Sequence, residues 1–377
     1  MNKVNKRYEQ LDKVFDFLEQ NRLFSGTVLL SEGGNSFYKR AIGKRSFQEK
    51  QSVDSIFEIA SISKSFTATA IMLLADNGSI RIDDPIKKFF PQLPYRGISI
   101  ENLLNHTSGL KDYMEWFENE ENWNHHKIVN NQDVVNFLET IQPKELFTVN
   151  KKWEYCNTGY VLLAETIRLV SNKEYGEFLN ENIFTPLNMV NTSTYSQFLD
   201  GNLKRFALGF MYDRKKDMNF LPNEIDSHKY VYFLDGVKGD GGIKSTVEDL
   251  FKWEKSFYTN KILSKKSVDY MLKPARIKNK TTGYCPGLHK EYGGYGFGWA
   301  LEEHSHYKKI VFHDGYWAGY GTGLISYRDY HKSIILLGNL DFTKEELNKT
   351  SHILALTLEK IFFHEEVNLE PFEQLIQ

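Results

Sequence analysis

The chain alternates between two hydrophobic periods, one typical of helices and one typical of strands, and these periods occupy different stretches. Residues 8–20 carry hydrophobic side chains three and four positions apart, which predicts an amphipathic helix. Residues 26–30 and 36–42 are short hydrophobic runs on either side of a turn that contains Gly33 and Gly34. This arrangement predicts a β-hairpin near the N-terminus.

Helical periodicity dominates the chain from about residue 61 to residue 275. The clearest predicted helices cover residues 64–76, the stretch around 158–170 and residues 246–258. The strand pattern returns late, in three short runs at Lys309–Phe312, Gly321–Tyr327 and Ser333–Leu337. A closing helix is predicted over residues 344–362.

Strands at both ends of the chain, with helices between them, predict an α/β fold of the α+β type. We expect one antiparallel sheet built from both termini and flanked by helices, with a large, mostly helical lobe inserted in the middle. Residues 1–66 and 232–377 would form the sheet lobe, and residues 67–231 the helical lobe. The two lobes are expected to pack as one compact unit, with a cleft where they meet.

Composition narrows the classes of protein that this chain can be. It has 377 residues, 41% hydrophobic and 25% charged, with 47 Lys and Arg against 49 Asp and Glu, a net charge of −2. These values are typical of a globular protein and exclude a disordered or disulfide-scaffold chain. The near-neutral balance argues against a nucleic-acid partner. No hydrophobic run approaches the roughly 18 residues that a transmembrane segment needs.

Two further features bear on the expected location. The N-terminal residues carry Lys and Arg, but acidic residues interrupt the apolar run that a signal peptide would need. Two cysteines, Cys156 and Cys285, fit a reducing compartment better than an oxidising one. We therefore expect a cytoplasmic protein, or an exported one if a leader has been removed. The pattern does not determine an oligomeric state.

The candidate chemistry starts from the spacing Ser-x-x-Lys, which brings an ammonium group beside a hydroxyl when both lie on a helix. The spacing occurs at least four times, beginning at Ser36, Ser61, Ser108 and Ser305. On a strand, positions i and i+3 point to opposite faces, which argues against Ser36 and Ser305, and Ser108 lies in a Gly-containing turn. Ser61 with Lys64 opens a long apolar helix, where backbone N–H groups favour a developing oxyanion. The alternative is that Ser61 only caps that helix.

Two further groups are candidates for the same site. Tyr155 and Asn157 lie just before a predicted helix, where a phenol can shuttle a proton and an amide can hold a substrate carbonyl. His313 ends a predicted strand, and the small Gly315 would let a substrate backbone approach the strand edge. The N–H of Tyr316 could join that of the serine as an oxyanion hole. Taken alone, each group fits a structural role in the core or in a turn better than a catalytic one.

Together and in this order, the three groups resemble the motifs of the β-lactamase-related serine hydrolases. That family includes class C β-lactamases, D-alanyl-D-alanine carboxypeptidases, D-aminopeptidases and related esterases. The stretches FEIASISKSFTATAIMLL, LLNHTSGL, NIFTPLNM, GDGGIKSTVEDLFKW and YGFGW are similar to the same family. The resemblance extends from about residue 20 to residue 340.

The resemblance implies a serine hydrolase that forms an acyl-enzyme on Ser61 and acts on an amide or ester: a β-lactam, a D-amino-acid peptide or a small ester. Lys64 would be the neighbouring base, and Tyr155 would take and return the proton. Asn157 would hold the substrate, and His313 would stand where many members carry a lysine. A neutral imidazole would hold a substrate carboxylate less strongly than a permanent ammonium, so potent β-lactam hydrolysis is not expected. The substrate would be a small molecule or a short peptide, with no cofactor and no metal.

Two other functions are compatible with the same motifs. The protein could be a penicillin-binding covalent binder or sensor that acylates with little turnover, or a scaffold whose site is disabled. One departure from the family pattern is Val149-Asn150, where members commonly carry Pro-Gly. It concerns the shape of the loop before Tyr155 more than the chemistry.

Several other residues are interpreted as structural. Cys156 is expected to be a small spacer, His106 a packing residue and residues 238–242 a turn. Lys280-Thr281-Thr282-Gly283 has the wrong spacing for a Lys-Thr-Gly motif and is predicted to be a loop. The aromatic stretch of residues 292–299 is equally compatible with the core and with a pocket wall. The pairs His125/His126 and His304/His306 lack accompanying metal ligands.

Overall fold

The structure, a computed structural model, describes residues 3–201, 203–277, 285–289 and 292–376. The helices are α1 Lys3–Gln20, α2 Ser63–Asp76, α3 Ile100–Leu104, α4 Met114–Phe117, α5 Asn131–Thr140, α6 Asn157–Ser171, α7 Tyr175–Leu179, α8 Tyr230–Phe233, α9 Val247–Thr259, α10 Lys265–Met271, α11 Lys344–Phe362 and α12 Glu370–Glu373. The strands are β1 Gly26–Glu32, β2 Asn35–Ile42, β3 Phe57–Glu58, β4 Phe210–Asp213, β5 Met218–Phe220, β6 Lys244–Ser245, β7 Cys285–Pro286, β8 Tyr292–Tyr295, β9 Ala300–His304, β10 Lys308–Trp317, β11 Tyr320–Tyr327, β12 Lys332–Gly338 and β13 Leu340–Asp341. Short helical turns are η1 Ala60–Ile62, η2 Ile86–Lys88, η3 Asn180–Phe184, η4 Pro222–Glu224, η5 Asp226–His228 and η6 Arg328–Tyr330.

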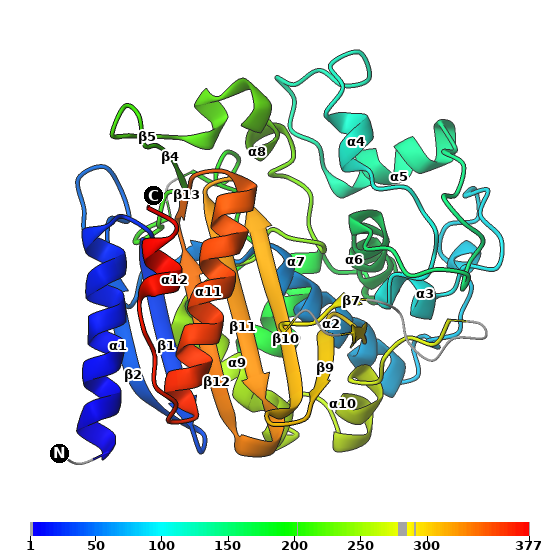
Figure 1. Ribbon diagram of the computed structural model, residues 1–377. Coiled ribbons are helices and arrows are strands. Elements are labelled where there is room, and N and C mark those ends of the chain that lie inside the picture. Colours follow the sequence, from blue (N-terminus) through cyan, green and yellow to red (C-terminus); the bar gives the residue numbers. More distant parts are fainter. Residues whose placement is uncertain (1–2, 202, 278–284, 290–291, 377) are drawn as a thin grey trace.

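One large antiparallel sheet draws its strands from both ends of the chain (Figure 1). Over the described residues its order is β2-β1-β12-β11-β10-β9-β8-β7. The N-terminal hairpin joins the C-terminal strands through β1 and β12, with Gly26 opposite Gly338 and Glu32 opposite Lys332. The predicted α+β fold, with a sheet built from both termini, is confirmed. The sequence pattern does not predict β8 and β9, because the glycine-rich stretch that they flank has little alternation of polar and apolar residues.

Different helices cover the two faces of this sheet. Helices α1, α11 and α12 lie over one face, and α2 and α9 lie over the other (Figure 1). On β12, Ile334 and Leu336 pack with the first group, whereas Ile335 and Leu337 pack with the second. Because side chains alternate along a strand, a strand covered on both faces is buried throughout, as β12 is.

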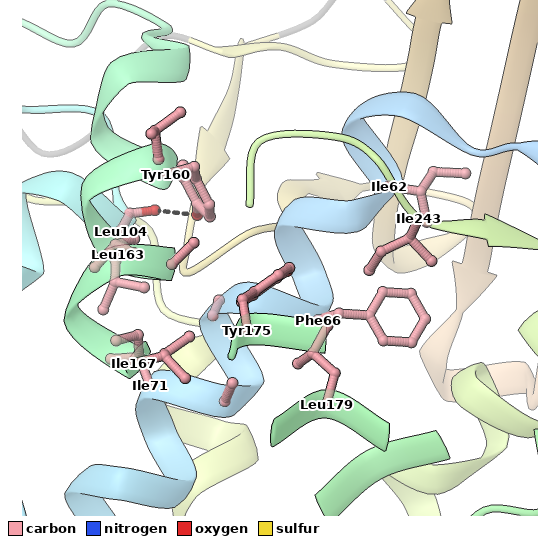
Figure 2. Packing of buried hydrophobic residues seen from close by; sticks show 14 of the residues in the cluster. Ile62, Phe66, Ile71, Leu104, Tyr160, Leu163, Ile167, Tyr175, Leu179 and Ile243 are labelled. Carbon is pink, nitrogen blue, oxygen red and sulfur yellow. Dashed lines mark hydrogen bonds between the residues drawn. The ribbon is translucent and has the colours of Figure 1, made fainter. Parts of the chain in front are cut away.

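Helix α2 is the central helix on the second face and is buried along almost its whole length. Phe66 stacks on Trp253 of α9 with ring centroids 4.1 Å apart, and meets Phe184 edge-on. Figure 2 shows Ile71 of α2 next to Ile167 of α6 within the same hydrophobic cluster. Packing on several sides fixes the rotation of α2 about its axis, and therefore the direction in which its first turn points.

Two small sheets tie distant segments to this core. In one, β3 pairs antiparallel with β6, so that Glu58 lies opposite Lys244. In the other, β4 and β5, from the stretch expected to be helical, join β13 near the C-terminus. The division into lobes at residues 66 and 232 stays a proposal. Among the described helices, none combines the length and the apolar character that crossing a membrane requires.

Candidate active site

The candidate nucleophile lies on a short turn between β3 and α2. Ser61 is the middle residue of η1, and α2 begins at Ser63, so the serine precedes the helix rather than opening it. Ala60, directly before it, has φ +47°, a left-handed conformation that residues with a side chain rarely adopt. Unusual backbone of this kind is concentrated at functional sites.

The sheet is in direct contact with this turn. A Cβ atom on Gly315 of β10 would lie 2.5 Å from the carbonyl oxygen of Ile59 and 3.1 Å from the Cβ of Ala60. Only a glycine therefore permits β10 to approach so closely. Thr322 of β11 donates a hydrogen bond to the same Ile59 carbonyl at 3.0 Å, so both strands hold the serine turn in place.

Lys64 reaches the serine from the first turn of α2. Its Nζ lies 2.9 Å from Ser61 Oγ and 2.7 Å from the carbonyl oxygen of Asp240. The side chain is 0% exposed, and this burial lowers the pKa of Lys64 to about 8, although the carboxylates of Asp240 and Asp112 act in the opposite direction. A lysine with this pKa has a substantial neutral fraction near pH 7, and a neutral amine can accept the serine proton.

Tyr155 completes the other side of the same pocket. The Nζ of Lys64 lies 4.8 Å from the centre of its ring. Burial raises the pKa of Tyr155 well above its ordinary value, while the neighbouring Ser61 hydroxyl acts against this rise. Within the described part of the chain, the buried Tyr155 hydroxyl forms no hydrogen bond. Because its pKa is raised, the phenol is neutral at rest, so it is suited first to give a proton and then to take one back, which reverses the order that the family resemblance implies.

Asn157 begins helix α6 and is half-buried beside the pocket. Its backbone N–H donates to Asp112 Oδ2 at 2.8 Å, and its Nδ2 lies 3.6 Å from the sulfur of Met114. Cys156, between the tyrosine and the asparagine, is buried and directs its thiol to the carbonyl of Leu110 at 3.3 Å. Burial raises the pKa of Cys156 to about 12, so no thiolate is available.

His313 is brought to the pocket by β10. Its ring centre lies 6.3 Å from that of Tyr155. Its Nδ1 lies 2.6 Å from the carbonyl oxygen of Asp314, which can only accept, so Nδ1 carries the proton. Its Nε2 lies 2.9 Å from the hydroxyl of Tyr295, which then donates. Burial lowers the pKa of His313 to about 4, so the imidazole is neutral at neutral pH.

Beyond His313, one edge of β10 has no strand beside it. Strand β9 pairs with β10 only over residues 308–312, so over residues 313–317 no described strand covers that edge. Gly315 faces the serine turn, whereas the Tyr316 side chain faces away from it, with Lys344 Nζ 5.1 Å from its ring centre. Only the backbone of Tyr316 can serve the predicted oxyanion hole.

The structure adds three residues to the site: two were predicted to be structural, and the role of the third was left open. His106 lies against the Tyr155 ring at 4.4 Å and accepts from the backbone N–H of Cys156 at 3.2 Å. Tyr295, from the stretch left open between core and pocket wall, contacts His313. The backbone of Asp240, from the segment predicted to be a turn, accepts from Lys64. The signal for all three was their position inside stretches similar to the family.

The other Ser-x-x-Lys pairs and the histidine pairs lie elsewhere. Ser36 is on strand β2, Ser108 accepts from the N–H of Leu110, and Ser305 is exposed between β9 and β10. Lys280-Thr281-Thr282-Gly283 lies outside the described residues. In the part of the chain that the structure describes, no group of three or more His, Cys, Asp or Glu residues could hold a metal ion.

A mixed sheet-and-helix fold, with a serine and a buried lysine one turn apart against β10, defines the class of this protein: it has the fold of the serine β-lactamases and penicillin-binding proteins. The chain belongs to the Beta-lactamase family, whose model matches residues 11–359.

Individual relatives support the same family. The chain is 38% identical over 364 residues to "Penicillin-binding protein 4*" of Bacillus subtilis (strain 168), which covers 96% of this chain and 77% of that protein. It is 26% identical to "Teichoic acid D-alanine hydrolase" of Staphylococcus aureus (strain MRSA252), over 76% of this chain and 67% of that protein. A D-amino acid amidase from Ochrobactrum anthropi SV3 has a similar fold, with a TM-score of 0.74 and 24% identity, covering 93% of this chain and 99% of that one. These relatives place the chain in a family of serine acyl hydrolases and acyl transferases.

Proposed function

We propose that the protein is a serine hydrolase that forms an acyl-enzyme on Ser61. The observation that carries the proposal is the 2.9 Å contact between the Nζ of a fully buried Lys64 and Ser61 Oγ. Tyr155 and His313 adjoin this pair from distant parts of the chain. A hydroxyl beside a neutral amine is the arrangement that nucleophilic catalysis by serine requires.

The proton transfers in acylation balance within the pocket. Neutral Lys64 takes the Ser61 proton as Oγ bonds to the substrate carbonyl carbon. When the tetrahedral intermediate collapses, the bond to the leaving amine or alcohol breaks, and that group takes the proton of Tyr155. Lys64 then returns its proton to Tyr155. In deacylation a water supplies the oxygen of the released acid, one of its protons passes to Lys64, and Ser61 Oγ takes that proton back.

Substrate binding would use the uncovered edge of β10. An extended acyl chain lying beside residues 313–317 could bond to the strand's backbone, as peptides do at exposed sheet edges. Asn157, half-buried at the start of α6, would hold the substrate through its side-chain amide. The backbone N–H groups of Ser61 and Tyr316 would hold the developing oxyanion.

The substrate class that fits best is an ester or amide of a D-amino acid with no carboxylate next to the scissile bond. The imidazole of His313 is neutral, with Nδ1–H committed to Asp314 and Nε2 to Tyr295. It therefore supplies no cation for a carboxylate on the leaving side. The names of two relatives, a teichoic acid D-alanine hydrolase and a D-amino acid amidase, agree with this class.

The test is covalent labelling followed by kinetics on a matched panel. Intact-mass measurement after incubation with D-alanine p-nitrophenyl ester or a fluorescent penicillin should show one acyl adduct, which Ser61→Ala abolishes. The control is Ser305→Ala, which removes an exposed serine with the same spacing to a lysine and should leave labelling unchanged. Labelling that persists in Ser61→Ala would refute the proposal. If kcat/KM for the ester does not exceed kcat/KM for a peptide ending in D-alanyl-D-alanine, the proposed substrate class is refuted, but the acyl-enzyme on Ser61 is not.

A penicillin-binding protein that acylates with little turnover is the second candidate. It is favoured by the 38% identity to a protein named for penicillin binding. Burst kinetics separate the two candidates: release of one equivalent followed by a stall indicates a binder, and a sustained steady state indicates an enzyme.

A further inference from the structure

A buried ion pair lies directly behind the serine turn and takes no part in the chemistry proposed above. Glu58 of β3 and Lys244 of β6 face each other across the two-stranded sheet, and their carboxylate and ammonium groups form a salt bridge. They are 6% and 2% exposed. Removing two charges from water costs desolvation free energy, so a buried ion pair is weak evidence for a stabilising role, and another role is worth testing.

Glu58 uses its other oxygen on the turn itself. Its Oε1 accepts the backbone N–H of Ala60 at 2.8 Å. Ala60 is the residue with φ +47°, and an alanine pays a conformational cost for this geometry. The Glu58 carboxylate thus bonds to Ala60, the residue just before the nucleophile. The backbone conformation of Ala60 is unfavourable without such a partner.

Lys244 connects the pair to the other groups around the serine. The backbone of its neighbour Ile243 accepts the N–H of Ile59 at 3.0 Å. Three residues before Ile243 in the chain, the Asp240 carbonyl accepts from Lys64 Nζ. A single short segment therefore holds the strand before the serine, the carboxylate that bonds to Ala60 and the amine of the proposed base.

The ammonium of Lys244 has a second partner that completes its charge balance. Asp235 Oδ1 lies 3.8 Å away, and Asp235 Oδ2 accepts the N–H of Phe198 at 3.0 Å and the hydroxyl of Ser196. Because the cation lies between two carboxylates, removing one of them leaves it partly compensated. This makes variants of Glu58 practical to test.

We infer that Glu58, held by Lys244, is a positioning residue: it fixes Ala60 in the left-handed conformation and so aims Ser61 Oγ at Lys64 and the substrate. The inference rests on the proposed acyl-enzyme function. It adds to that function the group that sets the direction of the nucleophile.

The test measures acylation by a fluorescent penicillin in four variants. Glu58→Ala removes the acceptor and should lower the acylation rate constant at saturation by about 10- to 100-fold. The half-saturating concentration should change by less than about twofold, because the variant loses the geometry of the nucleophile and not the affinity for the probe. Glu58→Gln keeps an acceptor oxygen and should lose much less. Ala60→Gly alone should stay close to wild type, since glycine adopts this φ freely. Glu58→Ala/Ala60→Gly should regain about 5- to 30-fold over Glu58→Ala, the factor that matches alanine's cost in this conformation.

If the buried Glu58 carboxylate were merely structural, its loss would lower stability without changing acylation. Glu254→Gln is the control for that case, because Glu254 is also a buried carboxylate, 6% exposed, and accepts from Ser326 Oγ, away from the pocket. This variant should lower the unfolding midpoint and leave the acylation rate unchanged. Hydrogen exchange in the segment of residues 57–62 provides a readout that does not need activity, and exchange there should be faster in Glu58→Ala than in Glu58→Gln.

Equal acylation by wild type and Glu58→Ala would overturn the inference, as would a loss that Ala60→Gly does not recover in folded protein. If Glu58→Ala does not fold, a Glu58→Gln protein that acylates as slowly as Ser61→Ala would overturn it too. If wild type is labelled neither by the fluorescent penicillin nor by D-alanine p-nitrophenyl ester, the proposed function itself is refuted instead.

Discussion

The pH dependence of acylation tests the central assignment, that Lys64 is the base. Its ordinary pKa of 10.5 falls to about 8 because the side chain is wholly buried. That difference corresponds to about 3 kcal/mol in favour of the neutral amine, or a neutral fraction at pH 7 about 300 times that of an exposed lysine. If the rate follows this fraction, it should rise about tenfold from pH 6 to pH 7 and about fivefold from pH 7 to pH 8, and level off above pH 9.

The assay is stopped-flow acylation by a fluorescent penicillin across pH 5 to 10 at constant ionic strength. The rise of the rate with pH, centred near pH 8, is called the limb of the profile. Neither His313 nor Tyr155 can produce it, because burial lowers the pKa of His313 to about 4 and raises that of Tyr155 well above its ordinary value. Lys64→Arg keeps a positive charge that cannot be lost, and should reduce acylation by about 10²- to 10⁴-fold. The residual rate should show no limb near pH 8.

A second buried lysine provides the control. Burial also lowers the pKa of Lys238 to about 8, and its Nζ bonds to the backbone oxygens of Asp235 and Tyr195, away from Ser61. Lys238→Met should therefore keep the limb. A wild-type rate that is flat from pH 6 to pH 9, or a limb near pH 8 that survives in Lys64→Arg and disappears in Lys238→Met, would refute Lys64 as the base.

Three further predictions follow from packing and charge. Gly298→Ala would place a Cβ 2.6 Å from the backbone oxygen of Lys64 at φ +73°, so urea unfolding should show a loss of stability of more than about 1 kcal/mol, together with slower acylation; an unchanged midpoint would contradict the close contact. Phe66→Ala removes a fully buried ring stacked on Trp253 and should cost about 3–5 kcal/mol of unfolding free energy, whereas a loss below about 1 kcal/mol would show that the stack contributes little. His313→Lys introduces a cation at the β10 edge, which can bind the carboxylate of a D-alanyl-D-alanine peptide. It should raise kcat/KM for that peptide, relative to kcat/KM for a D-alanine ester, about tenfold. An unchanged ratio would mean that the residue at position 313 does not contribute to selectivity for the leaving group.

Local sequence signals were enough for the longest helices and strands. Helix α9 lies within the predicted residues 246–258 except for its last residue, and the Thr246 hydroxyl caps it by accepting the N–H of Asp249 at 3.2 Å. The N-terminal hairpin and the three late strands appear in the predicted places, although β10 extends to Trp317. These elements depend on neighbours within a few residues, which is the range over which a sequence pattern is informative. Strand β9 depends on pairing with β10, strand β8 depends on pairing with β9, and the turn between them packs against α2, so no local pattern reveals them.

The same division applies to the site. The approach of Lys64 to Ser61 follows from a spacing of three residues next to a helix, and it was predicted from that spacing. The contacts of Tyr295 with His313 and of Glu58 with Ala60 and Lys244 were not predicted. Each involves a side chain whose role depends on which way a strand faces, and a shift of one residue in register would reverse that direction.

The sequence by itself determined the periodicity of the helices and strands, the serine and lysine one turn apart, and the order of the motifs that place the chain in its family. Only the tertiary structure decided the protonation states of the side chains in the site. An amine that holds its proton to pH 10.5 in water gives it up near pH 8 once α2, β10 and the 240–244 segment exclude solvent from Lys64. Desolvation is produced by all the surrounding segments together, and no single stretch of the chain contains the information that specifies it.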